Sequence, residues 1–393
     1  MERRVTPEQV RAFRLRAHHL DRKAPPEALE EAAGACGVQN SPPDAWETAL
    51  FHRVEGATLE SLRDALYREK RLLQAWSCRG VPMVFPTAES GVFLTPLAAR
   101  PGEEPWIYTR GVTAALEVLH MTFEELLPLV KEAVGTLEGR TVRSKEALDR
   151  VLAECVAERL PGAAREKWNG PSMYGSPDRQ TVGGAVASFL LRPCSFLSLV
   201  VFGERGDGSP TFTTFQSWTG RPPGDVPDAD RALTRKFLHC YGPATLRSFG
   251  EWLGASPQQA ARIWSSASEE LEPVQVAGRR CYVWAGDLED LLTAGECGDR
   301  LLLLGPHDPY LDLRDRSIIL EDMSHGREVW RTVANPGVIL QNGVVIGTWR
   351  GRTRRDRLEV ALTTWAAPRG SLEALAEEYA AFRHLSLGAC TRT

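Results

Sequence analysis

The chain has 393 residues, of which 43% are hydrophobic and 25% charged, and its formal net charge is −4. This length exceeds what one hydrophobic core organises, and the composition excludes a disordered or fibrous protein. The longest apolar stretch, residues 185–201, is interrupted by Arg192-Pro193-Cys194, and the polar N-terminus has no apolar segment that would direct export. We therefore expect a cytoplasmic protein of roughly three or four modules.

The first predicted module covers residues 1–108 and begins with a helix. Thr6-Pro7-Glu8-Gln9 combines an N-cap, a first-turn proline and a polar third position. Pro25-Pro26 opens a second helix, and further helices are expected at 44–53 and after Thr58, before a strand at 81–85. Helices followed by a short hairpin are the order of a winged-helix domain.

The same order recurs twice. In residues 109–220, helices at 121–134, after Ser144 and at 182–191 precede a hairpin of 197–202 and 211–215. In residues 221–296, helices at 230–240, 243–253 and 258–268 precede a hairpin of 274–276 and 281–283. The third of these helices, after the N-cap Ser256 and Pro257, is the one normally offered to the DNA major groove, which makes Gln258, Gln259 and Arg262 candidate DNA contacts.

Residues 297–393 change in character. Strand-like segments at 301–304, 317–320, 337–340, 344–349 and 357–364 predict a small antiparallel β-barrel, closed by a helix at 372–384. The predicted fold class is α+β, with three tandem winged-helix domains before the barrel. The charged residues between 308 and 316 are expected to form a self-neutralising ion-pair network that braces the barrel.

The positions of the cysteines and of the charged residues limit which metals, cofactors and macromolecules the chain can bind. The eight cysteines form no Cys-x-x-Cys pair, and no histidine lies at zinc-ligand spacing, so we expect neither a metal site nor a cofactor. Five arginines fall within residues 350–357, and others crowd the first helix. These clusters are either solvated faces or phosphate-binding surfaces. On the second interpretation the candidate DNA contacts include Arg16, His18, Arg79, Arg354 and Arg355.

Five segments in chain order resemble the AlkZ/YcaQ-type winged-helix DNA glycosylases: Gly37-Val38-Gln39-Asn40-Ser41-Pro42, Leu73 through Gly80, Cys240 through Thr245, His307-Asp308-Pro309-Tyr310, and Asn335-Pro336-Gly337-Val338 with Gly347-Thr348-Trp349-Arg350. The resemblance covers nearly the whole chain. It implies a C-shaped arrangement of the three winged-helix domains plus the barrel, and removal of alkylated purines, including crosslinks, from double-stranded DNA. We expect the chain to act as a monomer.

The resemblance also implies a catalytic motif, Gln-x-Gln or Gln-x-Asp, at Gln39-Asn40-Ser41. Gln39 matches its first position, whereas Ser41 matches neither form of its second. Hydrolysis of an N-glycosidic bond passes through an oxocarbenium-like sugar attacked by water. A carboxamide and a hydroxyl place a water but supply only dipoles, so such a site suits cationic N3- or N7-alkylpurines, which leave without protonation.

Three interpretations of Gln39-Asn40-Ser41 follow. Gln39 and Ser41 form a variant glycosylase site for cationic lesions. Alternatively, the chain is a non-catalytic DNA-binding relative, such as a lesion sensor or regulator. In the third, the segment only caps the helix that follows Pro42-Pro43, because Asn and Ser are favoured caps.

Overall fold

The computed structural model describes residues 3–105, 111–174, 180–295, 298–313 and 315–392. Its contacts divide the chain into two compact units. The first unit comprises residues 1–68, 234–249 and 267–393, and the second comprises residues 69–233 and 250–266. The predicted boundaries after residues 108 and 296, and Arg314 of the predicted ion-pair network, lie outside the described residues. The four-module division stays a prediction.

The N-terminal helix of the first unit confirms the predicted start. In α1 (Pro7–Ala17), Thr6 Oγ1 accepts a hydrogen bond from Gln9 N at 3.2 Å, and Gln9 Oε1 accepts one from Thr6 N at 3.0 Å. This capping box satisfies two backbone donors that a helix start leaves open. The elements that follow are α2 (Leu29–Gly34), β2 (Val38–Gln39), α3 (Ala45–Arg53) and α4 (Leu59–Arg63), the last two close to prediction.

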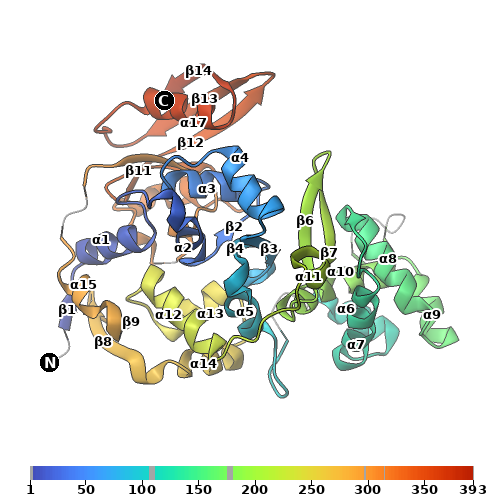
Figure 1. Ribbon diagram of the computed structural model, residues 1–393. Coiled ribbons are helices and arrows are strands. Elements are labelled where there is room, and N and C mark those ends of the chain that lie inside the picture. Colours follow the sequence, from blue (N-terminus) through green and yellow to red (C-terminus); the bar gives the residue numbers. More distant parts are fainter. Residues whose placement is uncertain (1–2, 106–110, 175–179, 296–297, 314, 393) are drawn as a thin grey trace. The chain divides into compact units, whose positions relative to one another are not determined.

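A three-stranded sheet lies beside α1 in the first unit (Figure 1). The predicted hairpin is present as β8 (Leu271–Val276) and β9 (Arg279–Trp284), and α15 (Leu288–Leu292) follows. Strand β1 (Arg3–Val5), which pairs parallel to β8, was not predicted from the sequence. Val5 from β1, Phe13 and Leu15 from α1, and Val274 from β8 are buried in one core.

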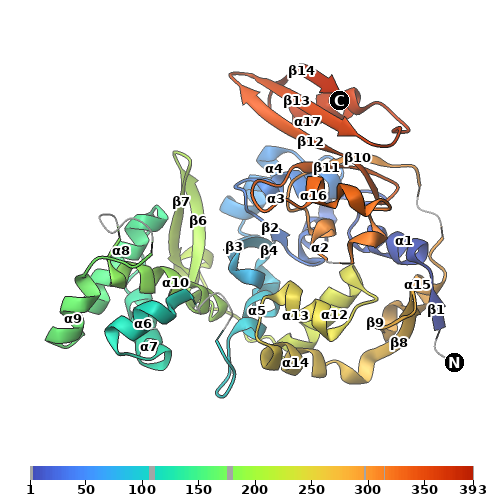
Figure 2. The ribbon, with the colours of Figure 1, turned by 180° about the vertical axis from the view of Figure 1, so that it is seen from behind.

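The C-terminal strands form an open sheet of five strands in the order β10-β11-β12-β13-β14. Their bounds are Leu301–Leu304, Gly337–Gln341, Val344–Arg354, Arg357–Thr364 and Ser386–Arg392. Helix α17 (Leu372–Phe382) packs against β10, β13 and β14, as Figure 2 shows, and the short α16 (Gly326–Val329) precedes β11. The helix α17 was predicted, but β14 after it was not.

The structure differs from the predicted antiparallel barrel in three details. Strand β14 runs parallel to β13, so the sheet is mixed rather than antiparallel. Residues Arg316–Ile318 form a 3₁₀ turn where a strand at 317–320 was expected. A short apolar run does not by itself distinguish a strand from a buried turn. No pairing between β10 and β14 closes the described strands into a barrel.

The second unit holds a helical group and two hairpins. Strands β3 (Leu72–Trp76) and β4 (Pro82–Pro86) pair antiparallel, as do β6 (Val200–Gly206) and β7 (Ser209–Thr214), and β5 (Val142–Arg143) joins β7. The helices are α5 (Ser90–Leu94), α6 (Thr113–Leu119), α7 (Phe123–Gly135), α8 (Lys145–Ala157), α9 (Gly162–Asn169), α10 (Val182–Phe196), α11 (Phe215–Thr219) and α14 (Pro257–Ser265).

One hydrophobic core joins β3, the helices α6 to α10 and the hairpin of β6 and β7. Trp76 of β3 stacks on Phe212 of β7, with ring centroids 5.4 Å apart. Helices α12 (Ala229–Tyr241) and α13 (Leu246–Leu253) contribute residues to both units. Within the described residues, no helix combines the length and apolarity needed to cross a membrane.

Candidate functional site

The segment Gln39-Asn40-Ser41 forms the end of β2 and the turn into α3. Gln39 is 7% exposed and Asn40 is 6% exposed, whereas Ser41 is partly exposed. The Gln39 side chain folds back along the motif, so that its Nε2 donates a hydrogen bond to the Ser41 carbonyl oxygen at 2.9 Å. This bond fixes the orientation of the carboxamide, and it therefore also fixes the direction of its oxygen.

Asn40, between the two predicted site residues, carries a buried polar atom that sequence analysis did not single out. Its side-chain Oδ1 has no hydrogen-bond partner among the described residues. A buried amide oxygen without a partner costs free energy, and a bound water or ligand is the usual explanation. The only signal in the sequence was its place inside the motif.

The capping interpretation is wrong. The N-cap of α3 is Asp44, in a left-handed conformation with φ of 68°, and its side chain makes no capping hydrogen bond. The first-turn amide of Ala45 donates to the Pro42 carbonyl, and that of Glu47 donates to the Asp44 carbonyl. Neither Asn40 nor Ser41 therefore serves as the cap.

A cavity of about 320 Å³ begins immediately after the motif in the first unit. Pro42, Thr48, Trp349, Arg350 and Arg383 are among the residues that line it. Gln39 and Ser41 are not among its lining residues, although Pro42, which follows Ser41, is.

The two α1 candidates differ in exposure. Arg16 is exposed, whereas His18 is 1% exposed. The His18 ring lies edge to face with Tyr241 and Tyr310, with centroids 5.1 and 5.6 Å away. A side chain buried to this degree has no surface left for DNA in this conformation.

Arg79 is partly exposed and takes a structural position in the second unit. Its backbone has φ of 57°, in the turn Cys78–Gly80 between β3 and β4. Its Nη1 donates to the Trp252 carbonyl oxygen at 2.8 Å. Arg79 therefore ties the β3–β4 turn to the end of α13.

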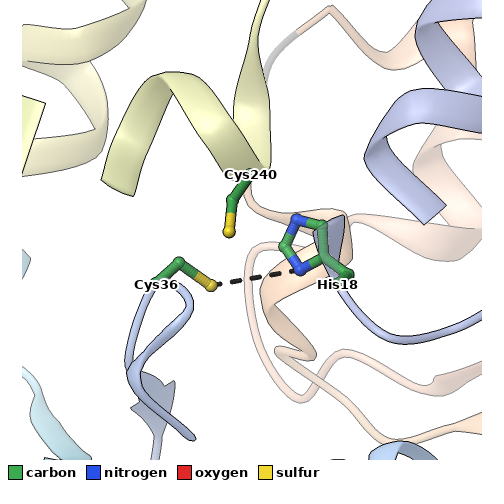
Figure 3. Close-up of side chains that lie close together, drawn as sticks. All are labelled: His18, Cys36 and Cys240. Carbon is green, nitrogen blue, oxygen red and sulfur yellow. Dashed lines mark hydrogen bonds between the residues drawn. The ribbon is translucent and has the colours of Figure 1, made fainter. Parts of the chain in front are cut away.

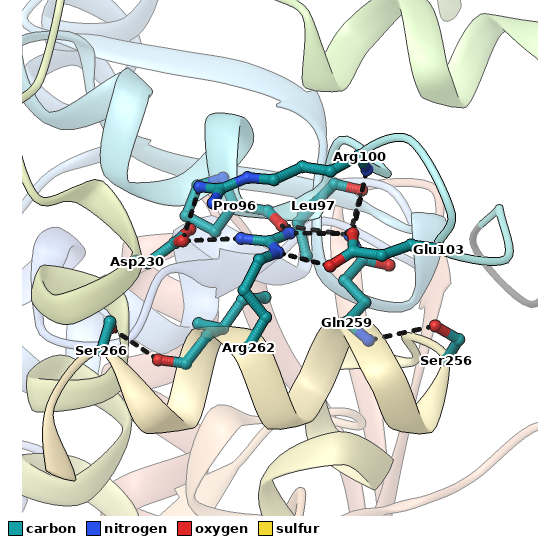
Figure 4. A network of polar contacts seen from close by, with 10 residues as sticks. Pro96, Leu97, Arg100, Glu103, Asp230, Ser256, Gln259, Arg262 and Ser266 are labelled. Atoms are coloured by element: carbon teal, nitrogen blue, oxygen red, sulfur yellow. Dashed lines mark hydrogen bonds and ion pairs between the residues drawn. The ribbon is translucent and has the colours of Figure 1, made fainter.

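Helix α14 starts as predicted, with Ser256 as its N-cap, but two of its three candidate side chains point into the second unit (Figure 4). Gln259 is fully buried, and its Nε2 donates to the Pro96 and Leu97 carbonyls at 3.1 and 2.8 Å. Gln258 is exposed. Of the three candidates Gln258, Gln259 and Arg262, only Gln258 is exposed enough to contact DNA at the surface.

Arg262 occupies the middle of an ion-pair network. Its Nε lies 2.6 Å from Glu103 Oε1, and its Nη1 lies 2.6 Å from Asp230 Oδ2, which Arg100 also contacts (Figure 4). Burial on its own raises the pKa of Glu103, but the hydrogen bonds from Arg262 and the backbone of Arg100 outweigh it and lower the pKa. The Glu103 carboxylate is therefore held in its charged form beside the guanidinium.

The arginine cluster of residues 350–357 forms the arms of the β12–β13 hairpin. Arg354 pairs in register with Arg357, and Arg355 stands in the turn with φ of 55°. All five arginines of the cluster are exposed. Arg354 makes an exposed ion pair with Glu359, with Nε to Oε2 at 3.1 Å. The hairpin therefore presents a basic surface, with five arginines against the two acidic residues Asp356 and Glu359.

Two acidic residues of the predicted ion-pair network of residues 308–316 pair with arginines outside it. Asp308 pairs with Arg53 of α3, and Asp315 pairs with Arg14 of α1 at 2.7 Å. These acidic residues therefore neutralise buried arginines of the N-terminal helices.

The described helices and strands form a mixed α+β fold. The family model described as DNA glycosylase AlkZ-like matches residues 32–384, so the chain belongs to this family. The Interstrand DNA cross-link repair glycosylase of Streptomyces sahachiroi is 25% identical over 355 residues, which are 87% of this chain and 86% of that protein. The solved structure of the DNA glycosylase AlkZ of Streptomyces sahachiroi superposes with a TM-score of 0.78 at 21% identity, over 99% of this chain and 100% of that one, and establishes the shared fold.

Proposed function

We propose that this chain is a monofunctional DNA glycosylase that hydrolyses the N-glycosidic bond of cationic N3- or N7-alkylated purines, interstrand crosslinks included. The observation that carries the proposal is the hydrogen bond from Gln39 Nε2 to the Ser41 carbonyl oxygen, which orients the Gln39 side chain. The family match spans this motif. The curated relative is named for crosslink repair, which supports the same substrate class.

In the proposed mechanism the residues of the motif position water and leave bond cleavage to the charged base. The Gln39 oxygen accepts a hydrogen bond from the attacking water, and the Ser41 hydroxyl supplies a second contact. Because a cationic purine leaves without protonation, the site needs no general acid. A neutral purine lacks this driving force, and it should be released far more slowly.

Four of the predicted DNA contacts remain part of the proposal. Arg16, Gln258, Arg354 and Arg355 are exposed, and the three arginines among them suit phosphate oxygens. His18, Gln259, Arg79 and Arg262 contact the protein itself, and their contribution to DNA binding is proposed to be indirect, through the shape of each unit.

The second candidate function is a DNA-binding relative without catalysis. Ser41 favours it, because a serine replaces the glutamine or aspartate of the family motif. Such a protein would bind duplex DNA in a salt-dependent manner and release no base.

The deciding experiment measures free N7-methylguanine and N3-methyladenine released from methylated duplex DNA. The wild-type chain should release base, and Gln39→Ala should abolish the release. Gln341→Ala is the matched control, because Gln341 is also buried and also donates its amide to a backbone carbonyl, that of Asp299 at 3.1 Å. Salt-dependent binding without release from any cationic lesion would favour the second function.

Ser41 variants distinguish a tuned site from a decayed one. If Ser41 is adapted to its own lesion, Ser41→Asp and Ser41→Gln should both lower release. If the motif has decayed on an intact scaffold, either substitution should raise it.

A further inference from the structure

Three side chains of the kinds that bind zinc meet in the core of the first unit (Figure 3). His18 follows α1, Cys36 lies between α2 and β2, and Cys240 is near the end of α12. One ligand atom from each lies within 4.8 Å of the other two, and His18 Nδ1 is 4.0 Å from Cys36 Sγ. The fold therefore assembles a set of ligands that sequence spacing could not reveal.

The polar atoms of this cluster have weak partners. His18 Nε2 is buried and has no hydrogen-bond partner among the described residues, while Nδ1 points toward Cys36 Sγ. Cys36 Sγ lies 3.6 Å from the Gly37 carbonyl oxygen, and Cys240 Sγ lies 3.8 Å from that of Ala17. Buried imidazoles normally make stronger hydrogen bonds than these. The imidazole packs against Tyr241 and Tyr310, while the contacts of the two thiols with backbone carbonyls are long.

We propose that His18, Cys36 and Cys240 bind one Zn²⁺ ion, with a fourth position open to water or another small ligand. Zinc takes thiolates at about 2.3 Å and imidazole nitrogen at about 2.0–2.1 Å in tetrahedral geometry. Those bond lengths place the ligand atoms roughly 3.5–3.8 Å apart. The observed His18–Cys36 separation of 4.0 Å therefore needs to close by a few tenths of an ångström, and the other separations, which are within 4.8 Å, by up to about one ångström.

The site has a structural role in this proposal. All three ligands are buried, so no DNA substrate reaches the ion. The ion would join α1, the approach to β2 and α12, and Cys36 stands three residues before Gln39. Binding would thereby hold the segment that carries the candidate catalytic motif, independently of whether that motif is active.

A zinc content measurement on the whole chain, purified with reduced thiols from zinc-supplemented cells, tests the site. One zinc per chain is expected, and Co²⁺ in its place should give thiolate-to-cobalt charge-transfer absorption. Cys36→Ser and Cys240→Ser should lose the metal and the absorption. Cys194→Ser is the matched control, because Cys194 is a fully buried free cysteine of the second unit, and it should keep both.

A second measurement uses the wild-type chain, so the test does not depend on whether the cysteine variants fold. Removal of the metal from the wild-type chain with a chelator should lower the Tm, and added zinc should restore it. Metal-free wild-type protein with reduced thiols that takes up no zinc would overturn the proposal. A Cys36–Cys240 disulfide in place of the metal, or equal zinc content in wild type and both cysteine variants, would do the same. None of these readouts depends on base release.

Discussion

Arg53 and Asp308 form a buried two-point ion pair, with Nη1 to Oδ2 at 2.8 Å and Nη2 to Oδ1 at 2.7 Å. Their side chains are 2% and 1% exposed. Asp308 Oδ1 also accepts a hydrogen bond from the Tyr310 amide at 3.0 Å. The pair joins the end of α3 to the turn at Pro309–Leu311. Because α3 is the helix that follows Gln39-Asn40-Ser41, the pair holds the helix that supports the C-terminal end of this motif.

Asp308→Asn should strongly destabilise the first unit. Removal of the carboxylate charge leaves the Arg53 guanidinium buried without a counter-ion, and breaking a buried pair costs about 3–5 kcal/mol. Urea unfolding measures the loss. Asp299→Asn is the control, because Asp299 pairs with Arg369 on the surface, where such a pair contributes about 0–1 kcal/mol. Equal losses in the two variants would contradict the assignment.

His52 should make stability fall with pH below neutrality. Burial lowers the pKa of His52 to about 3, and its Nε2 donates to the Leu303 carbonyl at 2.8 Å. The unfolded chain protonates this histidine near pH 6.5, so the folded state should lose about 1.4 kcal/mol per pH unit between about pH 6.5 and 3.

His52→Gln keeps an amide donor for Leu303 and removes the titration, so its unfolding free energy should depend less on pH in that window. His239 has the opposite sign, because its hydrogen bond to Asp287 raises its pKa and the stability it adds is lost as the pH rises. His239 is present in both proteins and cancels in the comparison. Parallel pH profiles for wild type and variant would argue against a neutral buried His52.

Local sequence signals predicted the helices that begin with an N-cap residue and the hairpins whose turns contain residues that favour positive φ. Thr6 and Ser256 are N-caps as expected, and Asn342-Gly343 adopts positive φ at both positions in the β11–β12 turn. Strands that form only by pairing with a distant segment carry no such local signal in the sequence. Strand β1 becomes a strand only by pairing with β8, 271 residues away in register (Arg3 with Val274), and β14 only by pairing with β13.

The candidate site was predictable in position but not in environment. The resemblance placed Gln39 and Ser41, and the structure adds the buried Asn40 oxygen between them. The prediction for α14 assumed that its polar side chains face solvent. Gln259 and Arg262 instead satisfy carbonyls and carboxylates of the chain itself, which a helix considered alone does not reveal.

Arg262→Ala should lower stability and leave the salt dependence of DNA binding unchanged. Its loss leaves the Glu103 and Asp230 carboxylates with fewer donors in a partly buried setting, at a cost of about 2 kcal/mol. Gln258→Ala on the exposed face of α14 is the control, and it should leave stability unchanged. An Arg262→Ala chain with wild-type Tm and a reduced salt slope would show that the residue contacts phosphate instead.

Arg354→Ala and Arg355→Ala should weaken DNA binding without loss of stability. Both residues stand exposed at the end of the β12–β13 hairpin, where an arginine reaches a phosphate at little cost to the fold. Each phosphate contact removed should reduce the slope of log K against log salt concentration by about 0.9. Arg68→Ala is the matched control, because Arg68 is an exposed arginine that, like Arg354, pairs with an exposed carboxylate, at 3.3 Å from Asp64. If all three variants keep the wild-type slope, the hairpin is a solvated face and the phosphate contacts lie elsewhere.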